Sequence, residues 1–193
     1  MLKSLMAGFS LVELMVAMVS GLGIVLCISS LYAAQLRLDE QLIEQIRFRQ
    51  GVQTLIDVIE HDMRRAGYLA AGAAVGPTAW PGLYWSANCV VVAIDMNGDG
   101  VWGGEQELRG YRFHAGRRRL EVKSWLQRPV SPAAACQEAG WQDMTDGQYR
   151  ITAFELMAVA PSHNILSMRV VAQDPHSSAL EVSDERRLLL RNW

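Results

Sequence analysis

Residues 9–32 form a run of apolar and small side chains with a single charge, that of Glu13. As an α-helix this run is about 36 Å long, enough to cross a hydrocarbon core of about 30 Å. It is longer than the apolar core of a secretory signal, and it lacks the polar face of a helix packed onto a soluble domain. Lys3 precedes it, which favours a cytoplasmic amino terminus. The pattern predicts one membrane-spanning helix, with most of the chain outside the cytoplasm.

Residues 33–66 continue the helical pattern, now with an apolar face and a charged face. The apolar positions recur at the i, i+3, i+4, i+7 spacing of an amphipathic helix. They are Val52, Leu55, Ile56, Ile59, Met63 and Ala66. Gly67 follows directly, where a helix C-cap is expected. We therefore expect one long helix whose second half packs onto the rest of the chain.

Beyond a loop-rich connector over residues 68–88, the pattern changes to short apolar or β-branched segments separated by turn residues. The strands predicted in this way cover residues 89–94, 108–114, 120–125, 149–157, 165–171 and 186–190. A helix followed by a series of short strands is typical of the α+β class. The expected arrangement is one sheet packed on the helix.

Composition supports a membrane anchor joined to a globular head. The chain has 193 residues, a length that suits one ordinary domain and an appendage, and all six tryptophans lie from Trp80 onward. The 18 basic and 20 acidic residues nearly cancel. Collagen-like, coiled-coil and disordered chains are excluded by composition, and an electrostatically driven nucleic-acid binder is disfavoured.

Glu13 is the anomaly of the apolar run. A carboxylate within a membrane costs a few kcal/mol unless it is paired, so such residues are functional by default. One interpretation is that a cation is brought to the same depth. The other is that the side chain reaches the nearby interface. Position by itself leaves both open.

The segment from Gly8 to Glu13 reads GFSLVE and resembles the processing motif of type IV pilins and type II secretion pseudopilins. The resemblance implies cleavage between Gly8 and Phe9 by a membrane-embedded prepilin peptidase, followed by N-methylation of Phe9. It also implies that Glu13 is the glutamate that these proteins keep at the fifth position after the cut. A neighbour's Glu13 carboxylate would then receive the charged amino terminus when the helix leaves the lipid for a filament.

A second stretch, His61 to Tyr68, reads HDMRRAGY and resembles the end of the long helix in PilW-family minor pilins. J-type minor pseudopilins carry a looser version. The implied fold is a long amino-terminal helix packed on an antiparallel β-sheet head. The implied parts are a leader over 1–8, a transmembrane and assembly helix over 9–32, its amphipathic half over 33–66 and a periplasmic head over 67–193.

The segment from Asp95 to Gly100 has the D-x-N-x-D-G form of a calcium loop. Asp95, Asn97 and Asp99 alternate as oxygen ligands, and the glycines allow a sharp turn. The twelfth position, which is Glu in an EF-hand, is Gln106, so Glu105 or Glu107 would have to complete the site. Strands flank the loop, which excludes a true EF-hand. A plain Asx-rich turn remains the alternative to a Ca²⁺ site.

Cys89 and Cys136 are the two cysteines outside the apolar run, which contains Cys27. In an oxidising compartment we expect them to form a disulfide, which stabilises the fold by about 4 kcal/mol in the chain-entropy model. Two buried free thiols are the alternative. Cys27 is interpreted as a lipid-facing or packing residue.

Enzymatic chemistry is not predicted. The four histidines have no metal-ligand spacing, and the sequence has no nucleophile elbow, Walker motif or dinucleotide glycine motif. Arg117, Arg118 and Arg119 could contact an anion or a nucleic acid. The head from Gly67 onward nevertheless carries 12 basic and 13 acidic residues, so a solvated hairpin end explains them better.

The predicted function is that of a minor pilin, a structural subunit that takes part in priming and assembling a type IV pilus. Expected partners are other minor pilins, the major pilin, the prepilin peptidase and the inner membrane, and no nucleic acid is expected. The protein would be stored as a single-pass inner-membrane protein and then enter the pilus. The alternatives are a minor pseudopilin of type II secretion and a pilus-tip module that acts as a calcium-dependent adhesin or a DNA-binding domain.

Overall fold

The structure is a computed structural model that describes residues 10–70, 82–102, 107–127, 129–159, 164–177 and 179–192. The predictions for Gly8, Phe9 and Glu105 lie outside these residues. The chain divides into two units, with the boundary between Ile46 and Arg47, and each unit is described by itself.

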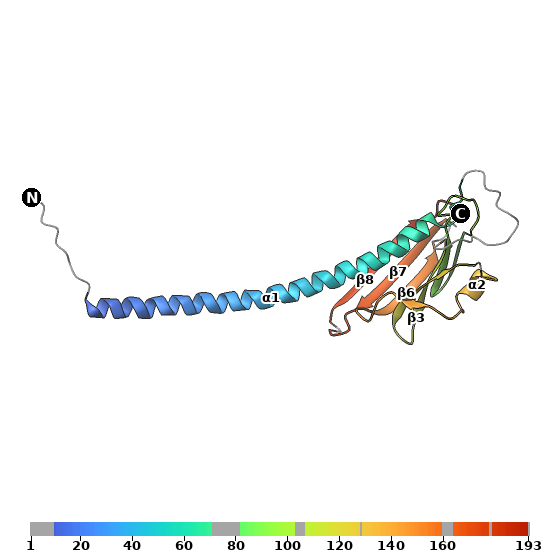
Figure 1. Ribbon diagram of the computed structural model, residues 1–193. Coiled ribbons are helices and arrows are strands. Elements are labelled where there is room, and N and C mark those ends of the chain that lie inside the picture. Colours follow the sequence, from blue (N-terminus) through green and yellow to red (C-terminus); the bar gives the residue numbers. More distant parts are fainter. Residues whose placement is uncertain are drawn as a thin grey trace, which may run out of the picture. The chain divides into compact units, whose positions relative to one another are not determined.

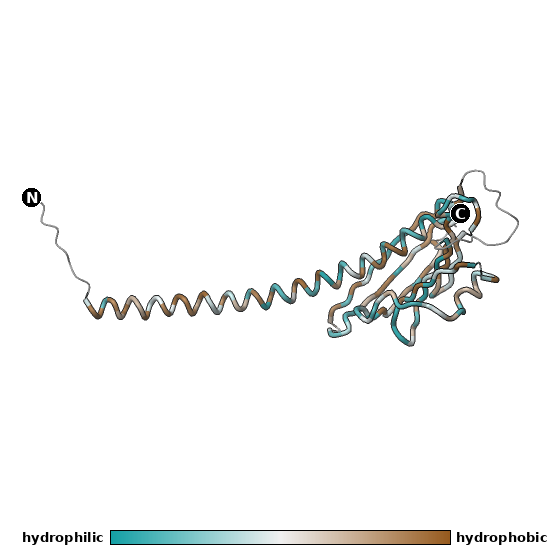
Figure 2. Tube along the Cα trace, in the orientation of Figure 1, coloured by the Kyte–Doolittle hydropathy of each residue, from teal (hydrophilic) through white to brown (hydrophobic). Residues whose placement is uncertain are grey.

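The first unit is the amino-terminal part of helix α1, which runs from Leu11 to Arg65. Figure 2 shows that this part of the tube is mostly hydrophobic. It contains an 18-residue window with a mean hydropathy of 2.4, so α1 is long and apolar enough to cross a membrane. The long amino-terminal helix predicted from the hydropathy pattern is therefore present.

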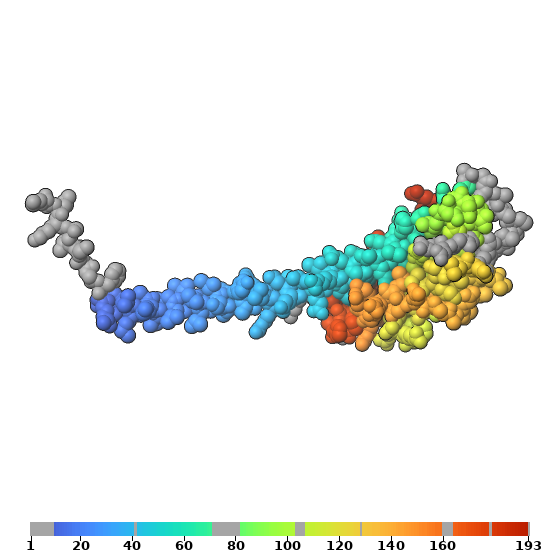
Figure 3. All heavy atoms as spheres, viewed as in Figure 1, coloured from blue at the N-terminus to red at the C-terminus, as the bar shows by residue number. Residues whose placement is uncertain are grey.

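The second unit contains the last turns of α1, whose apolar face is buried against the head. Figure 3 shows these turns lying against the strands near the carboxyl end of the chain. All of the residues predicted to form this face are buried, and Phe48 extends it towards the amino terminus; they are Val52, Leu55, Ile56, Ile59, Met63 and Ala66. The helical periodicity thus identified the packing face.

The described strands of the head form two antiparallel sheets, so the expectation of one sheet was wrong. The first has the order β1-β2-β3-β4-β5. Its strands are β1 (Leu83–Ser86), β2 (Cys89–Ala93), β3 (Leu108–His114), β4 (Arg119–Trp125) and β5 (Gln142–Asp143). The second has the order β6-β7-β8, with β6 (Arg150–Ala158), β7 (Ile165–Gln173) and β8 (Glu181–Leu189).

The strands that differ from prediction are short or begin with charged and polar residues. β1 lies in the predicted connector, β5 has two residues, and β8 begins at Glu181 although the pattern placed its start at residue 186. Glu181, Ser183 and Glu185 of β8 are exposed charged or polar residues. These segments are strands because each pairs with a longer, more apolar neighbour: β1 with β2, β5 with β4 and β8 with β7.

Both faces of the first sheet are covered, which explains why all five residues of β2 are buried. Val90 and Val92 face the core that includes α1 and the second sheet. Cys89, Val91 and Ala93 face a smaller cluster that includes Ala135 of the short helix α2 (Pro132–Ala135). Figure 1 shows α2 on the opposite side of the head from α1. The head is thus layered as helix, sheets and a covering segment.

Candidate functional site: assembly helix and acidic loop

The helix of the first unit exposes large apolar side chains along its whole length. Leu11 is 74% exposed, Leu26 69% and Ile46 51%. A surface of this extent is stable only in lipid or against other apolar helices. This part of α1 is therefore suited to storage in a membrane and to packing in a helical assembly.

Glu13 caps the helix in which it lies. The backbone N–H of Ser10 donates to Glu13 Oε2 at 3.1 Å, and the N–H of Leu14 donates to the Ser10 carbonyl at 3.1 Å. A Ser followed three residues later by Glu is the sequence signature of a capping box, and a carboxylate in the first turn interacts favourably with the helix dipole. This local role was visible in the sequence and was missed. The assembly role of Glu13 stays a prediction.

The other end of α1 is joined to the head by a buried carboxylate. Asp62 is 7% exposed, and its Oδ2 accepts hydrogen bonds from Arg109 Nη1 at 2.8 Å and from the Tyr111 hydroxyl at 2.6 Å. Burial, together with the bond to Asp62, raises the pKa of Tyr111. Burying a charge is costly unless it is paired and hydrogen-bonded, and here both conditions are met. The bonds attach the end of α1 to β3.

Gly67 lets the chain turn sharply from α1 into the head. Its φ of 77° is in the left-handed region that favours glycine. A Cβ at this position would lie 2.9 Å from the carbonyl oxygen of Asn192. The Gly67 N–H donates to the Ala93 carbonyl at 2.8 Å, so the predicted C-cap also connects the helix end to β2.

The acidic loop, residues 95–101, follows β2 and contacts the segment that follows the end of α1. Asp95 is 2% exposed, and its Oδ1 accepts the N–H of Gly98 at 2.7 Å. Its Oδ2 accepts the N–H of Ala70 at 3.0 Å and that of Gly100 at 2.9 Å. The bond from Ala70 is the main cause that lowers the pKa of Asp95, although burial opposes it. Asp95 thus holds both its own loop and the segment after α1.

Three carboxylates of this region converge. One ligand oxygen each from Asp95, Asp99 and Glu107 lies within 4.8 Å of the others. Glu107 is 1% exposed, and its Oε1 accepts the N–H of Met96 at 3.3 Å. Within the described residues this is the one cluster of three potential metal-ligating side chains. An all-oxygen donor set of this kind suits a hard cation such as Ca²⁺.

Asn97 holds the shape of the loop. Its Oδ1 accepts the N–H of Asp99 at 2.8 Å, and its Nδ2 donates to Asp99 Oδ2 at 2.9 Å. Asp99 Oδ1 accepts the N–H of Val101 at 2.8 Å. These are the bonds of consecutive Asx turns. The structure therefore brings together four of the five predicted ligands, and Glu105 is the one that lies outside the described residues.

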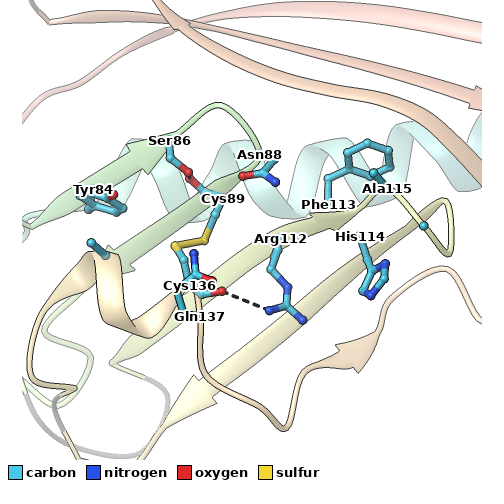
Figure 4. A pocket seen from close by; sticks show the side chains of 12 residues that line it. Tyr84, Ser86, Asn88, Cys89, Arg112, Phe113, His114, Ala115, Cys136 and Gln137 are labelled. Carbon is cyan, nitrogen blue, oxygen red and sulfur yellow. Dashed lines mark hydrogen bonds between the residues drawn. A yellow bond between two sulfur atoms is a disulfide. The ribbon is translucent and has the colours of Figure 1, made fainter.

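Cys89 and Cys136 are joined in a disulfide, as predicted from the cysteine count. Figure 4 shows that it links β2 to the segment after α2 at the wall of a pocket of about 410 Å³. In the same pocket Arg112 donates to the Cys136 carbonyl at 3.1 Å and pairs with Glu121 at 2.6 Å. Cys27 is free and exposed on α1.

Two of the three arginines of the β3–β4 hairpin lie near carboxylates of the head. Arg119 Nη1 lies 2.7 Å from Asp143 Oδ2, and Arg117 Nη1 lies 4.0 Å from Glu121 Oε1. Arg118 has a φ of 53°, which places it in the tight turn. The hairpin-end interpretation of this basic run agrees with these contacts.

Comparison with known protein families assigns the chain to one of them. A family model described as prepilin peptidase-dependent protein B matches residues 41–188, well over half of the chain. No curated protein and no solved structure matches it. The matched residues comprise the end of α1 and almost the whole head, so they are independent of the processing motif at Gly8 to Glu13. The predicted resemblance to a type IV pilin-like minor pilin is confirmed: the chain belongs to the prepilin peptidase-dependent protein B family.

Proposed function

We propose that this protein is a minor pilin that takes part in priming and assembling a type IV pilus as a structural subunit, not as an enzyme. The observation that carries the proposal is the exposed apolar helix of the first unit, which needs lipid or other helices around it. The family match supports the proposal from a different part of the chain, the head.

In this proposal the membrane stores the subunit until assembly. Cleavage after Gly8 frees the amino terminus of Phe9, the helix exchanges lipid for neighbouring pilin helices, and Glu13 pairs with a neighbour's terminal amine. The head stays in the periplasm until the subunit enters the pilus. Its partners are the major pilin and other minor pilins, and the prepilin peptidase acts on it once.

Deleting the gene should strongly reduce surface pili, and the full chain supplied in trans should restore them. Counting pili by electron microscopy and quantifying sheared major pilin measure the effect. If the deletion leaves pili intact but stops secretion of folded exoproteins, the protein is a minor pseudopilin of type II secretion. If both are intact and only adhesion or DNA uptake is lost, it is a tip-binding module.

Two substitutions of Glu13 separate the effect of its charge from the effect of its capping hydrogen bond. Glu13→Ala removes both, whereas Glu13→Gln keeps an acceptor for the Ser10 N–H. If the charge pairs with a neighbouring amine, both variants should insert and be processed normally, yet fail to restore pili. Glu44→Gln, on an exposed part of the same helix, is the matched control. Normal piliation by Glu13→Gln would show that capping is the whole role of this residue.

We also propose that the acidic loop binds Ca²⁺ through Asp95, Asn97, Asp99 and Glu107. Support comes from the convergence of three carboxylates, two of them almost fully buried, because a divalent cation would offset their mutual repulsion. An ion that binds only the folded state stabilises it by about 2.7 kcal/mol at a hundredfold excess over Kd.

Calorimetric titration and thermal melts of the detergent-solubilised protein test the calcium site. Ca²⁺ should release heat on binding and raise the Tm, and Asp99→Ala should abolish both responses. Asp146→Ala, which removes an exposed carboxylate from another loop, should leave them unchanged. Identical melts in chelator and in millimolar Ca²⁺ would reduce the loop to an Asx turn and leave the pilin proposal untouched.

A further inference from the structure

Three arginines line one pocket where α1 ends. Arg64 and Arg65 close the helix, and Arg191 follows β8 near the other end of the chain. The two segments lie together, because Asn192 Nδ2 donates to the Ala66 carbonyl at 3.2 Å, and Figure 1 shows the end of α1 beside the carboxyl end of the chain. The pocket has a volume of about 550 Å³, and residues 95–98 of the acidic loop also line it.

Two of these guanidinium groups form no ion pair with the part of the chain that the structure describes. Arg64 is paired with Glu60 within the helix. Arg65, by contrast, donates to the sulfur of Met96 at 3.4 Å, a weak acceptor. Arg191 makes no hydrogen bond or ion pair with the described part of the chain. The pocket therefore presents two guanidinium groups that pair with no carboxylate among the described residues.

The pocket also contains a carboxylate, whose hydrogen bonds go to backbone N–H groups rather than to these arginines. Asp95 lines the wall, but its two oxygens accept backbone N–H groups of Ala70, Gly98 and Gly100. Those bonds hold the carboxylate within its own loop, and no ion pair joins it to an arginine among the described residues. A ligand that offers carboxylates would therefore meet unpaired guanidinium groups.

The remaining walls suit a protein segment. Tyr68 is 47% exposed and Met96 is 49% exposed, so an aromatic ring and a flexible thioether flank the arginines. Arginine, tyrosine and methionine are enriched at protein interfaces, and the arginine fork binds carboxylates with two parallel bonds. This combination favours an acidic peptide segment with an apolar side chain beside its carboxylates.

We propose that this arginine pocket, formed by Arg64, Arg65, Tyr68 and Arg191, receives a segment of a neighbouring pilin subunit that carries at least two carboxylates. The inference rests on the proposed pilin function and adds to it the surface of the head through which one neighbour is chosen. Charge complementarity sets that choice: an acidic segment binds, and a neutral or basic segment is rejected.

Photocrosslinking in intact, piliated cells tests the pocket in the full-length protein. A benzophenone amino acid replaces Tyr68, and the adduct is mapped by mass spectrometry. We expect one pilin subunit to be captured through a segment containing two or more Asp or Glu residues. The same probe at Met157, which is 59% exposed on β6, is the control for capture elsewhere on the head.

Charge variants then test whether the crosslink depends on the arginines of the pocket or on positive charge elsewhere on the head. Arg65→Glu combined with Arg191→Glu should lower the crosslink yield at least tenfold, and Arg65→Gln with Arg191→Gln should lower it less. Arg150→Glu with Arg187→Glu makes the same change in charge at two exposed arginines elsewhere on the head and should leave the yield unchanged. Replacing the mapped acids of the partner by Lys should restore capture by the Glu variant.

The pocket proposal is overturned if the adduct maps to a segment without carboxylates or to a lipid, if the yield does not respond to charge reversal, or if no adduct forms in piliated cells. Such results leave the pilin function standing as long as deletion of the gene abolishes pili. Normal pili and normal secretion in the deletion strain would instead overturn the proposed function itself.

Discussion

Individual polar residues at the end of α1 hold contacts between parts of the chain that are far apart in sequence. Asp62 is the clearest case, since its carboxylate is buried and bonded to Arg109 and Tyr111 of β3. A hydrogen bond to a charged group contributes about 1.5–3 kcal/mol, and leaving a buried partner unsatisfied costs at least as much. These three side chains should therefore act as a unit.

Tyr111→Phe should lower the free energy of unfolding by about 1.5–3 kcal/mol, because Asp62 loses its shortest hydrogen bond while remaining buried. Urea unfolding of the full chain in detergent measures the effect. Tyr84→Phe is the matched control, since the Tyr84 hydroxyl has no hydrogen bond in the described structure. Combined with Asp62→Asn, Tyr111→Phe should cost much less than it does by itself; strict additivity would argue against a coupled pair.

Because of Asp95, the stability of the fold should decrease as the pH falls into the acid range. Its pKa in the folded protein lies below the ordinary value of 3.8, chiefly because the Ala70 N–H donates to it. A carboxyl whose pKa falls on folding stabilises the fold above its unfolded pKa, and this contribution is lost as pH falls through the folded pKa. Asp95→Asn should therefore lower the Tm at pH 7, and the difference from wild type should shrink below pH 3.8.

Thermal melts from pH 7 to pH 2.5 check this dependence in the absence of Ca²⁺. Asp146→Asn, which changes an exposed carboxyl outside the acidic loop, is the matched control. A difference between Asp95→Asn and wild type that is constant across this range would contradict the assignment.

At the scale of elements, the disulfide and α2 cover the face of the first sheet that α1 does not reach. Cys89 on β2 and Cys136 after α2 are separated by 47 residues. The cross-link encloses β3, β4 and α2 and holds the covering segment on a cluster that includes Trp125. Without the disulfide, the apolar contacts of this cluster would have to hold α2 on the sheet.

Replacing both Cys89 and Cys136 by Ala should lower the free energy of unfolding by about 4 kcal/mol. The reason is that the cross-link joins residues 47 positions apart and so lowers the conformational entropy of the unfolded chain. Cys27→Ala, at the free cysteine of α1, should have no such effect in denaturant titrations. Non-reducing peptide mapping of wild type should recover one linked pair, Cys89 with Cys136. Free thiols at both positions in protein purified from the periplasmic side would contradict the expectation.

At the scale of the whole molecule, two parts of the chain suit different surroundings. The helix up to Ile46 exposes apolar side chains and needs lipid or helices, whereas the unit from Arg47 buries its own core. The family match begins at residue 41 and does not include the processing motif at residues 8–13. This division fits the proposed minor pilin, whose helix is stored in a membrane before the subunit assembles.

The mature protein should begin at Phe9 with a methylated amine, and Gly8→Leu should accumulate uncleaved. Intact-mass measurement of membrane-extracted protein distinguishes the two forms. Gly23→Leu introduces the same side chain at an open position of the helix and should be processed normally. Retention of Met1 in wild type, with active prepilin peptidase in the same cells, would contradict the processing prediction.

The sequence by itself determined those features whose cause is local. Helical periodicity identified the buried face from Val52 to Ala66, hydropathy identified the exposed helix, and composition paired the two cysteines of the head. The D-x-N-x-D-G spacing located the acidic loop, because Asx turns form between residues two or three positions apart. Neighbouring residues contain the information for each of these features.

Only the tertiary structure decided which distant segments meet. The division of the strands into two sheets, the bonds of Asp62 to β3 and the position of Arg191 beside Arg64 all join segments that lie far apart in the sequence. β5 and the first half of β8 have weak strand patterns, and β1 is only four residues long; each of these strands pairs with the backbone of a longer neighbour. Such contacts form where burial and hydrogen bonding are satisfied together over the whole head, and a periodic pattern in one segment does not specify its partner.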